Sequence, residues 1–492
     1  TVVNKGAIIV VNQDELNEKN IKKAGFDSDP LEPGNKLLSD FTVHKIPITT
    51  LTLEALVDME MGHQDKLRCK NFLALGVVSW LFSRSLEPIE NFLKAKFGKK
   101  QMVLEANTKV LHAGFNICDT MEIFPVMYKV PPAKLEPGTY RNINGALATT
   151  YGLLTAAEKI DLPIVYAGYP ITPASEVLHL LSALKQFDVS AVQTEDEIAA
   201  ITMALGAAYG GSLGITGSSG PGLALKIEAL NLAVMTELPL IVFDFMRSGI
   251  STGMPTKTEQ GDLLMALFGR PSDSHVIVLA PSTAADCFWI SIEAVRLATK
   301  YMTPVVVLSE GFLVNASEPW KLPNLKKIPK IKSPFRNKVE GYLPYKRNKE
   351  TLARDWVRIG TQGLEHTIGG LEKLNETGGV TQDPDNHDLM TRLRAEKVQK
   401  VANDIPDLEI IGEEDADLLL VGWGSSLGSM RAAVEAVNQS GKKVAMINIR
   451  YLNPLPKNLT NILRSYKKVA VVELNLGQLN MIIRSRFLID TS

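Results

Sequence analysis

A regular alternation of short apolar strands and helices between residues 138 and 322 constrains the fold of this chain most strongly. Runs of β-branched and other apolar residues occur at 162–167, 213–216, 240–245 and 304–308, and helix-like segments separate them. Continuous apolar strands joined by helices are typical of a parallel sheet that is covered on both faces. We therefore predict an α/β fold built on a parallel sheet.

The rest of the chain divides around this block, and the whole length suits about three domains. Residues 1–128 read as a separate α/β piece. Residues 127–138 contain three prolines in twelve positions, which favours an extended linker. Residues 323–410 are polar and irregular and end in a charged helix. Residues 411–492 again alternate strand and helix and form a last α/β unit.

Charge and cysteine content limit the partners that this chain can have. Lys plus Arg number 53 and Asp plus Glu number 54, so the balance gives no reason to expect a nucleic-acid partner. The three cysteines, Cys69, Cys118 and Cys287, form no CxxC pair. We therefore predict neither a metal site nor an iron–sulfur cluster in this chain, and the sparse cysteines fit a cytoplasmic protein.

The chain lacks the sequence signals of membrane insertion and of secretion. No apolar run reaches the roughly 18–20 residues that span a bilayer, so we expect no membrane partner. The beginning of the chain also lacks the charged and apolar regions of a signal peptide. Thr1 replaces an initiator methionine, and both ends fall close to predicted elements. We expect further sequence beyond both ends.

Polar segments follow four of the predicted strands. They cover residues 169–176, 193–200, 216–222 and 247–262. Ligands of open parallel sheets bind beyond the carboxyl ends of the strands. Each segment also has an ordinary structural interpretation, so the four are weighed separately.

The first two segments place polar side chains at helix starts. In Tyr-Pro-Ile-Thr-Pro, two prolines stiffen the turn around Thr172, which either caps the next helix or helps to bind a carboxylate. Gln-Thr-Glu-Asp-Glu puts Glu195 directly after a strand, with Glu197 as a competing candidate. Such an acid either favours the positive end of a helix or hydrogen-bonds a ligand nitrogen.

The other two segments supply a tight turn and a cation. Thr-Gly-Ser-Ser-Gly-Pro-Gly is either an ordinary strand–helix turn or a loop whose amides face a ligand. Arg247 begins a Gly-, Ser- and Thr-rich loop. Its guanidinium suits a substrate carboxylate, or it pairs with a structural acid such as Asp244 or Asp262.

In this order, the four segments resemble the pyrimidine-binding domain of thiamine-diphosphate-dependent 2-oxoacid:ferredoxin oxidoreductases, whose hallmark is Tyr-Pro-Ile-Thr-Pro. Residues 1–128 resemble the gamma domain of that family, without its first glycine-rich turn. Residues 411–492, including Gly477-Gln478, resemble its transketolase C-terminal-like domain. The segments at 361–366 and 383–387 are similar to fused gamma–alpha subunits assigned to 2-oxoglutarate.

The resemblance implies roles for individual residues. Glu195 matches the glutamate that hydrogen-bonds N1′ of the aminopyrimidine and so drives acid–base chemistry through the cofactor. Thr172 and Arg247 match the positions that hold the substrate carboxylate. The residues expected to line the cofactor are Pro170, Ile171, Glu195, Ser219 and Gly220.

The resemblance also implies a partner. The chain has no Gly-Asp-Gly segment for Mg²⁺ and diphosphate and no cluster of cysteines. In this family a beta subunit carries Mg²⁺ and a [4Fe-4S] cluster, in an (αβ)₂ assembly that passes electrons to ferredoxin. The implied reaction is oxidative decarboxylation of a 2-oxoacid with coenzyme A to acyl-CoA and CO₂. 2-Oxoglutarate is favoured over pyruvate and branched-chain 2-oxoacids, and the physiological direction is left open.

Two other functions compete with this one. The Ser-Gly-Pro-Gly turn is similar to that of acetolactate-synthase-like lyases, which usually carry their own diphosphate domain. A non-catalytic α/β scaffold subunit is the second alternative. Separately, residues 422–428 could suggest a dinucleotide site, but Arg450 stands where an acid would be expected to contact the ribose. We interpret that loop as structural.

Overall fold

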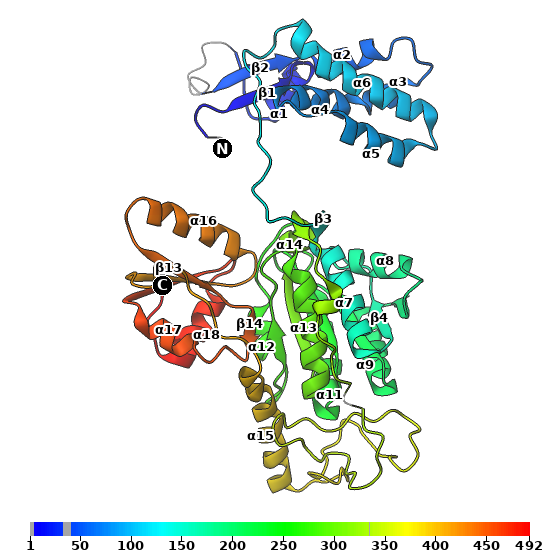
Figure 1. Ribbon diagram of the computed structural model, residues 1–492, viewed down its shortest axis with the longest axis vertical. Coiled ribbons are helices and arrows are strands. Elements are labelled where there is room, and N and C mark those ends of the chain that lie inside the picture. The colour runs from blue at the N-terminus through cyan, green and yellow to red at the C-terminus, as the bar shows by residue number, and fades with distance from the viewer. Residues whose placement is uncertain (1–3, 33–40, 334) are drawn as a thin grey trace. The chain divides into compact units, whose positions relative to one another are not determined.

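The computed structural model describes residues 4–32, 41–333 and 335–492 (Figure 1). The chain forms two compact units, Thr1–Glu136 and Pro137–Ser492. Across the described ranges, no helix combines the length and the apolar character needed to cross a membrane. All three cysteines are free and buried.

The first unit packs helices around two parallel strands, β1 (Ile8–Asn12) and β2 (Thr42–Ile46). Close approach of two helices forms its core. A Cβ added to Gly76 would lie 2.2 Å from the Leu111 carbonyl oxygen, and one added to Gly114 would lie 2.1 Å from that of Leu73. The α-helices in the described part of this unit are α1 (Glu18–Lys23), α2 (Ile48–Ala55), α3 (His63–Leu67), α4 (Lys70–Leu81), α5 (Glu87–Phe97) and α6 (Gln101–Thr120).

The second unit is built on a seven-stranded sheet with the order β14-β8-β9-β7-β6-β4-β5 (Figure 1). Its strands run parallel, apart from β14, which is antiparallel to β8. This confirms the predicted α/β fold with a parallel sheet. The strands are β4 (Ile164–Gly168), β5 (Val189–Gln193), β6 (Leu213–Ser218), β7 (Ile241–Met246), β8 (Ile277–Leu279), β9 (Val305–Glu310) and β14 (Tyr451–Asn453).

Both faces of this sheet are buried along its central strands, which explains why apolar residues occupy consecutive positions in β7 and β9. In β7, Phe243 and Phe245 enter one core, whereas Val242 and Met246 enter the other. The first core includes residues of α7 (Gly145–Ile160), α8 (Ser175–Ala183) and α13 (Asp286–Tyr301). The second includes residues of α9 (Glu197–Gly210), α11 (Ile227–Thr236), α12 (Leu263–Phe268) and the C-terminal part of the chain.

The C-terminal part has its own four-stranded sheet, ordered β11-β13-β12-β15. Strand β14 leaves this part and pairs with β8 of the large sheet, which joins the two sheets through one short stretch of chain. The elements are β11 (Ile411–Gly412), β12 (Leu418–Gly422), α16 (Ser426–Gln439), β13 (Val444–Asn448), α17 (Leu459–Ser465), β15 (Lys468–Val472) and α18 (Gln478–Phe487).

The irregular segment before α15 (Pro384–Lys400) runs along the amino edge of the large sheet, where helices end and strands begin. Trp356 Nε1 donates to the carbonyl oxygen of Ala208 in α9 at 3.1 Å. Arg354 Nε donates to that of Thr236 in α11 at 3.2 Å. The last carbonyls of a helix lack partners within the helix and favour cations. The segment is therefore irregular because it runs past the C-terminal ends of successive helices. Its basic side chains interact favourably with the free carbonyl groups at those ends.

A buried ion cluster fixes this segment and α15 to the end of α11. Arg347 Nη2 lies 2.5 Å and Lys397 Nζ 2.6 Å from the Glu237 carboxylate, which is fully buried. Burial alone would raise the pKa of Glu237, but the two cations outweigh it and hold the pKa well below the ordinary value. Lys397 also donates to the carbonyl oxygen of Met302 at 2.9 Å.

We expect Glu237→Ala to destabilise the second unit by about 3–5 kcal/mol, because it leaves two buried cations without their counter-charge. Urea unfolding followed by circular dichroism measures the change. Glu228→Ala is the matched control, since Glu228 lies exposed on the same helix. Equal midpoints for the two variants would contradict a stabilising role for the cluster.

Candidate functional site

The four segments singled out in the sequence meet at the carboxyl edge of the large sheet. Strands β4, β6 and β7 are neighbours, with Gly168 beside Gly217 and Ser218 beside Asp244. The chain therefore leaves the sheet at adjacent points. The backbone N–H of Thr194 donates to the carbonyl oxygen of Gly168 at 3.0 Å, which joins the second segment to the end of β4.

The first segment holds Thr172 on the surface. The peptide bond between Thr172 and Pro173 is cis, and Pro173 is buried whereas Thr172 is exposed. Helix α8 has no side-chain cap, and its N-cap residue is Ala174. The capping interpretation of Thr172 is therefore wrong, and its hydroxyl makes no hydrogen bond within the described parts of the chain. Pro170 is exposed and Ile171 half-buried beside it.

The second segment separates its acids by burial. Glu195 precedes α9 and is exposed, whereas Glu197 in the first turn is only 8% exposed. Asp196 caps α9, since its Oδ1 accepts from the Ala199 N–H at 2.7 Å. Buried Lys226 donates to the carbonyl oxygen of Glu197 at 2.7 Å. Glu197 is thus covered by its own chain, and Glu195 is open to a ligand that arrives from outside.

The third segment makes a turn that has no room for larger residues. Strand β6 continues to Ser218, two residues beyond the predicted end, and α10 (Gly220–Leu225) follows. A Cβ on Gly220 would lie 2.7 Å from Asp262 Oδ2, and one on Gly222 would lie 1.9 Å from Ser218 Oγ. The glycines therefore let the turn lie directly on polar side chains.

Several hydroxyls around this turn are buried without a hydrogen-bond partner in the described structure. A buried polar group without a partner loses its hydration and gains nothing in return. Such groups suit a site that a ligand or ordered water completes. They belong to Thr216, Ser218 and Ser219.

A pair of carboxyls lies beneath the turn. Asp244 lies within strand β7, not at its end, and its side chain is fully buried. It interacts with Asp262. Burial, and then the neighbouring acid, raise the pKa of Asp244 well above its usual range. Burial also raises the pKa of Asp262. Both shifts favour the protonated form, as expected for two acids that share a buried site. From the sequence, these acids are expected only as partners of Arg247, although an aspartate inside an apolar strand itself indicates a functional site.

Arg247 spans two of the segments. Its Nη1 donates to the carbonyl oxygen of Thr172 at 3.3 Å and its Nη2 to that of Ser251 at 3.5 Å. Within the described residues it forms no ion pair with Asp244 or Asp262, so the interpretation of a direct salt bridge is wrong, although its charge lowers the pKa of Asp262 against the effect of burial. Its Nε is buried and unpartnered. The guanidinium is thus held beside Thr172 with donor capacity left for an anion.

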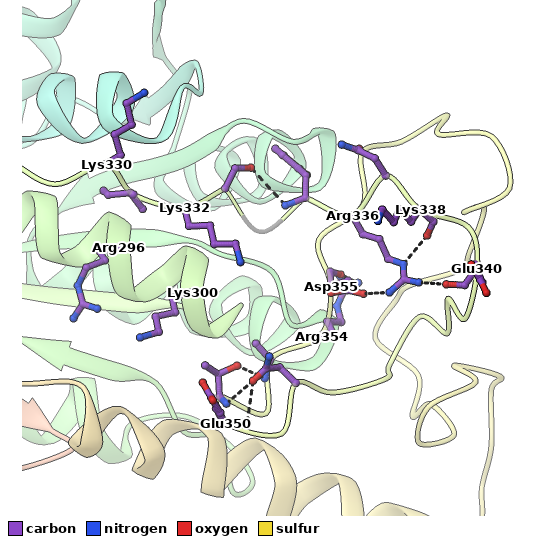
Figure 2. A pocket seen from close by; sticks show the side chains of 17 residues that line it. Arg296, Lys300, Lys330, Lys332, Arg336, Lys338, Glu340, Glu350, Arg354 and Asp355 are labelled. Carbon is purple, nitrogen blue, oxygen red and sulfur yellow. Dashed lines mark hydrogen bonds and ion pairs between the residues drawn. The ribbon is translucent and has the colours of Figure 1, made fainter.

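A cavity of about 910 Å³ lies away from this site, where the irregular segment meets α13 (Figure 2). Acids already compensate part of its charge: Asp404 pairs with Arg296 at 2.8 Å and Lys300 at 2.7 Å. None of the predicted site residues lines it. Its basic side chains are Arg296, Lys300, Lys330, Lys332, Arg336, Lys338 and Arg354.

Comparison with known protein families gives matches along most of the chain. Residues 157–385 match the family described as pyruvate flavodoxin/ferredoxin oxidoreductase, thiamine-diphosphate-binding. Residues 416–487 match core domain II of pyruvate:ferredoxin oxidoreductase. Residues 1–117 match the family described as pyruvate ferredoxin/flavodoxin oxidoreductase.

Individual proteins are similar over 64–99% of the chain. The 2-oxoglutarate oxidoreductase subunit KorA of Mycobacterium tuberculosis is 50% identical over 99% of this chain and 74% of its own length. The 2-oxoglutarate synthase subunit KorA of Methanothermobacter marburgensis is 32% identical over 64% of this chain and 84% of its own. The structure of 2-oxoglutarate:ferredoxin oxidoreductase from Magnetococcus marinus, with 2-oxoglutarate, coenzyme A and succinyl-CoA bound, matches with a TM-score of 0.84 and 31% identity. That match covers 98% of this chain and 84% of the other.

We expect Gly222→Ala to destabilise the second unit by about 1–3 kcal/mol, because its methyl group would overlap Ser218 Oγ in a closely packed turn. Differential scanning calorimetry measures the lowered midpoint. Gly206→Ala is the control, since nothing lies within 4 Å of its added Cβ on exposed α9. That variant should gain about 0.5–1 kcal/mol. Similar midpoints for both variants would show that the turn has room.

Proposed function

Because the chain belongs to the 2-oxoacid:ferredoxin oxidoreductase family, as its four strand-end segments predicted, we propose that it supplies the pyrimidine side of a thiamine diphosphate site. The enzyme oxidatively decarboxylates 2-oxoglutarate, with coenzyme A and ferredoxin as co-substrates. The observation that carries the proposal is the exposed Glu195, two residues before Glu197, whose side chain packs against the glycine turn with its unpartnered hydroxyls.

Glu195 is the proton-handling residue of this proposal. When bound, thiamine diphosphate supplies a carbon nucleophile that adds to the 2-oxo group and takes up the electrons released with CO₂. Glu195 hydrogen-bonds N1′ of the aminopyrimidine and holds a proton there, which lets the ring's amino nitrogen act as a base. Glu197 is the weaker candidate because its side chain is packed beneath the glycine turn, with its Cγ 2.9 Å from a Cβ added to Gly222.

The residues around Glu195 give the ring a defined place. Ser219 and Gly220 form the buried start of α10, where backbone and hydroxyl groups face the ring. Pro170 and Ile171 offer apolar contact from the end of β4. The glycines allow the ring to approach the backbone closely.

Arg247 and Thr172 bind the substrate carboxylate in this proposal. Arg247 is anchored to the backbone of Thr172, so the guanidinium and the free hydroxyl are presented together. A guanidinium and a hydroxyl are suited to a carboxylate through charge-assisted hydrogen bonds. 2-Oxoglutarate is the substrate we propose, because relatives named for it cover nearly the whole chain.

A beta subunit completes the site. We propose that it brings Mg²⁺, the diphosphate grip and a [4Fe-4S] cluster, and that two copies of each subunit form an (αβ)₂ assembly. Apolar side chains at the carboxyl edge support a covering partner, since exposed apolar groups in one area are typical of interfaces. These exposed side chains are Ile250, Met254, Leu474 and Leu476.

The free cysteines are in keeping with a cytoplasmic location.

Co-expression with the beta subunit tests the function directly. The assembly should reduce a viologen dye with 2-oxoglutarate and coenzyme A, and more slowly with pyruvate or branched-chain 2-oxoacids. Carbon–carbon condensation without dye reduction would support a non-redox lyase instead. Full activity of the beta subunit in the absence of this chain would support a scaffold role.

We expect Glu195→Gln to lower the turnover number by about 10²–10⁴-fold, the usual contribution of a positioned acid–base group. The (αβ)₂ complex should remain intact in size-exclusion chromatography, because the Glu195 side chain is exposed. Glu197→Gln should retain most of the turnover. The opposite ranking of the two variants would assign the role to Glu197.

We expect Arg247→Ala to raise the KM for 2-oxoglutarate by about 10–100-fold, the equivalent of one charge-assisted hydrogen bond of about 1.5–3 kcal/mol. Steady-state kinetics of dye reduction measure it. Arg431→Ala is the control, because Arg431 lies exposed on α16 away from the site. An unchanged KM in Arg247→Ala would remove this residue from substrate binding.

A further inference from the structure

We propose that Gln260 and Glu310 form a latch through which the C-terminal part of the chain positions the loop 247–262. This loop, called the substrate loop below, begins with Arg247. The inference rests on the proposed function of Arg247 and extends it to residues that touch neither cofactor nor substrate. It also gives a role to two sequence features without one so far, the glycine loop at 422–428 and Gln478.

Glu310 is the centre of the latch. It ends strand β9 and its side chain is fully buried. Its Oε1 accepts from Gln260 Nε2 and from the Ser425 N–H, each at 2.8 Å. Its Oε2 accepts from the Ser425 hydroxyl and from Thr258 Oγ1. Both oxygens therefore connect the substrate loop to the loop that follows β12.

Gln260 uses the whole of its amide in the same junction. Its Nε2 donates also to the Trp423 carbonyl oxygen at 2.9 Å, and its Oε1 accepts from the Leu474 N–H at 2.8 Å. Its backbone N–H donates to the Leu474 carbonyl oxygen at 3.0 Å. Next to it, Gln478 Nε2 donates to the Gly261 carbonyl oxygen at 2.6 Å. The end of the substrate loop is thus paired with two separate loops of the C-terminal part.

A short path leads from the latch to Arg247. Glu259, adjacent to Gln260, accepts with Oε2 from Ser248 Oγ and from the Gly249 N–H, each at 2.8 Å. The backbone of Ser248 also pairs with that of Lys257 at 3.0 Å. The two ends of the substrate loop are therefore fastened to each other, and fixing Gln260 fixes the backbone next to Arg247.

Gly424 shows how closely the two parts approach. It adopts φ +59°, and a Cβ there would lie 2.1 Å from Glu310 Oε1 and 2.6 Å from Gln260 Nε2. The glycine therefore serves contact with the latch, which accounts for the loop at 422–428 without a dinucleotide.

Burial makes this junction sensitive to small displacements. Gln260 and Glu310 are each 0% exposed, so a lost bond is not replaced by water. Burial raises the pKa of Glu310, while donation from Ser425, Gln260 and Thr258 opposes that rise. The junction is thus satisfied in one arrangement, which suits a positioning role.

Kinetics of the (αβ)₂ enzyme test the latch. Gln260→Ala and Glu310→Ala should raise the KM for 2-oxoglutarate by about tenfold and change the turnover number by less than about threefold, since loosened Arg247 weakens substrate and transition state alike. Glu310→Gln should retain a KM near wild type, because its amide can still accept from Gln260 and the Ser425 N–H. The hydroxyls of Ser425 and Thr258 can turn to accept from it.

Glu237→Ala is the matched control, because it removes a buried carboxylate at the opposite edge of the same sheet. It should lower the melting temperature without raising the KM. An equal rise in KM for Glu237→Ala, or an unchanged KM for both latch variants, would overturn the proposal.

Hydrogen exchange gives a readout that does not depend on activity. Backbone amides of residues 248–257 should exchange faster in Glu310→Ala than in wild type or Glu310→Gln, whether or not 2-oxoglutarate is turned over. Unchanged exchange in that segment would overturn the latch. Inactivity of the wild-type assembly toward all 2-oxoacids, with faster exchange in Glu310→Ala, would instead overturn the proposed function and leave the latch supported. Gln478→Ala provides a milder variant should Glu310→Ala fail to fold.

Discussion

Burial of the large parallel sheet on both faces is the constraint from which the other features follow. Strands β6, β7 and β9 have no exposed position, so polar chemistry is concentrated where the chain leaves the sheet. At the amino edge, helix carbonyls meet a basic, irregular segment. At the carboxyl edge, polar turns and helix starts meet the C-terminal part. One layered core thus separates an amino edge held by a buried ion cluster from a carboxyl edge at which we propose that ligands bind.

Three buried carboxyl sites illustrate different solutions to the same desolvation cost. Two cations hold Glu237 ionised, and the pKa is depressed. Glu310 has only uncharged donors, which do not fully offset burial, and the pKa is raised. Asp244 faces another acid and keeps a raised pKa. The cation-paired site lies at the amino edge of the sheet, whereas the two carboxyls with raised pKa values contact the substrate loop through Asp262 and Gln260, so the carboxyl edge carries the costlier groups.

The sequence predicted much of the fold and the identity of the segments at the site. Apolar runs gave the parallel strands, because burial on both faces leaves a local signature. Strand β14 was not predicted, because its pairing with β8 depends on residues distant in the sequence. Helix α6 was not predicted either, although a helix of this length depends only on local sequence. The Asp244–Asp262 contact and the latch also join residues far apart in sequence. Hydrophobic periodicity cannot reveal such contacts. The glycines of the turns were the sequence feature that indicated where segments of the chain approach one another closely.

In our proposal, the exposure of Glu195 follows from the division of a site between two chains. A carboxylate buried without a partner is costly, so an acid awaiting a ligand from another subunit is best left in water. Glu197, which has no such ligand in our proposal, is instead covered by the glycine turn of its own chain. In this proposal, association would dehydrate Glu195 only when a ring nitrogen is present to bond it. The same logic requires the substrate loop to be fixed beforehand, because an arginine that had to be ordered during binding would lose part of its interaction energy to entropy.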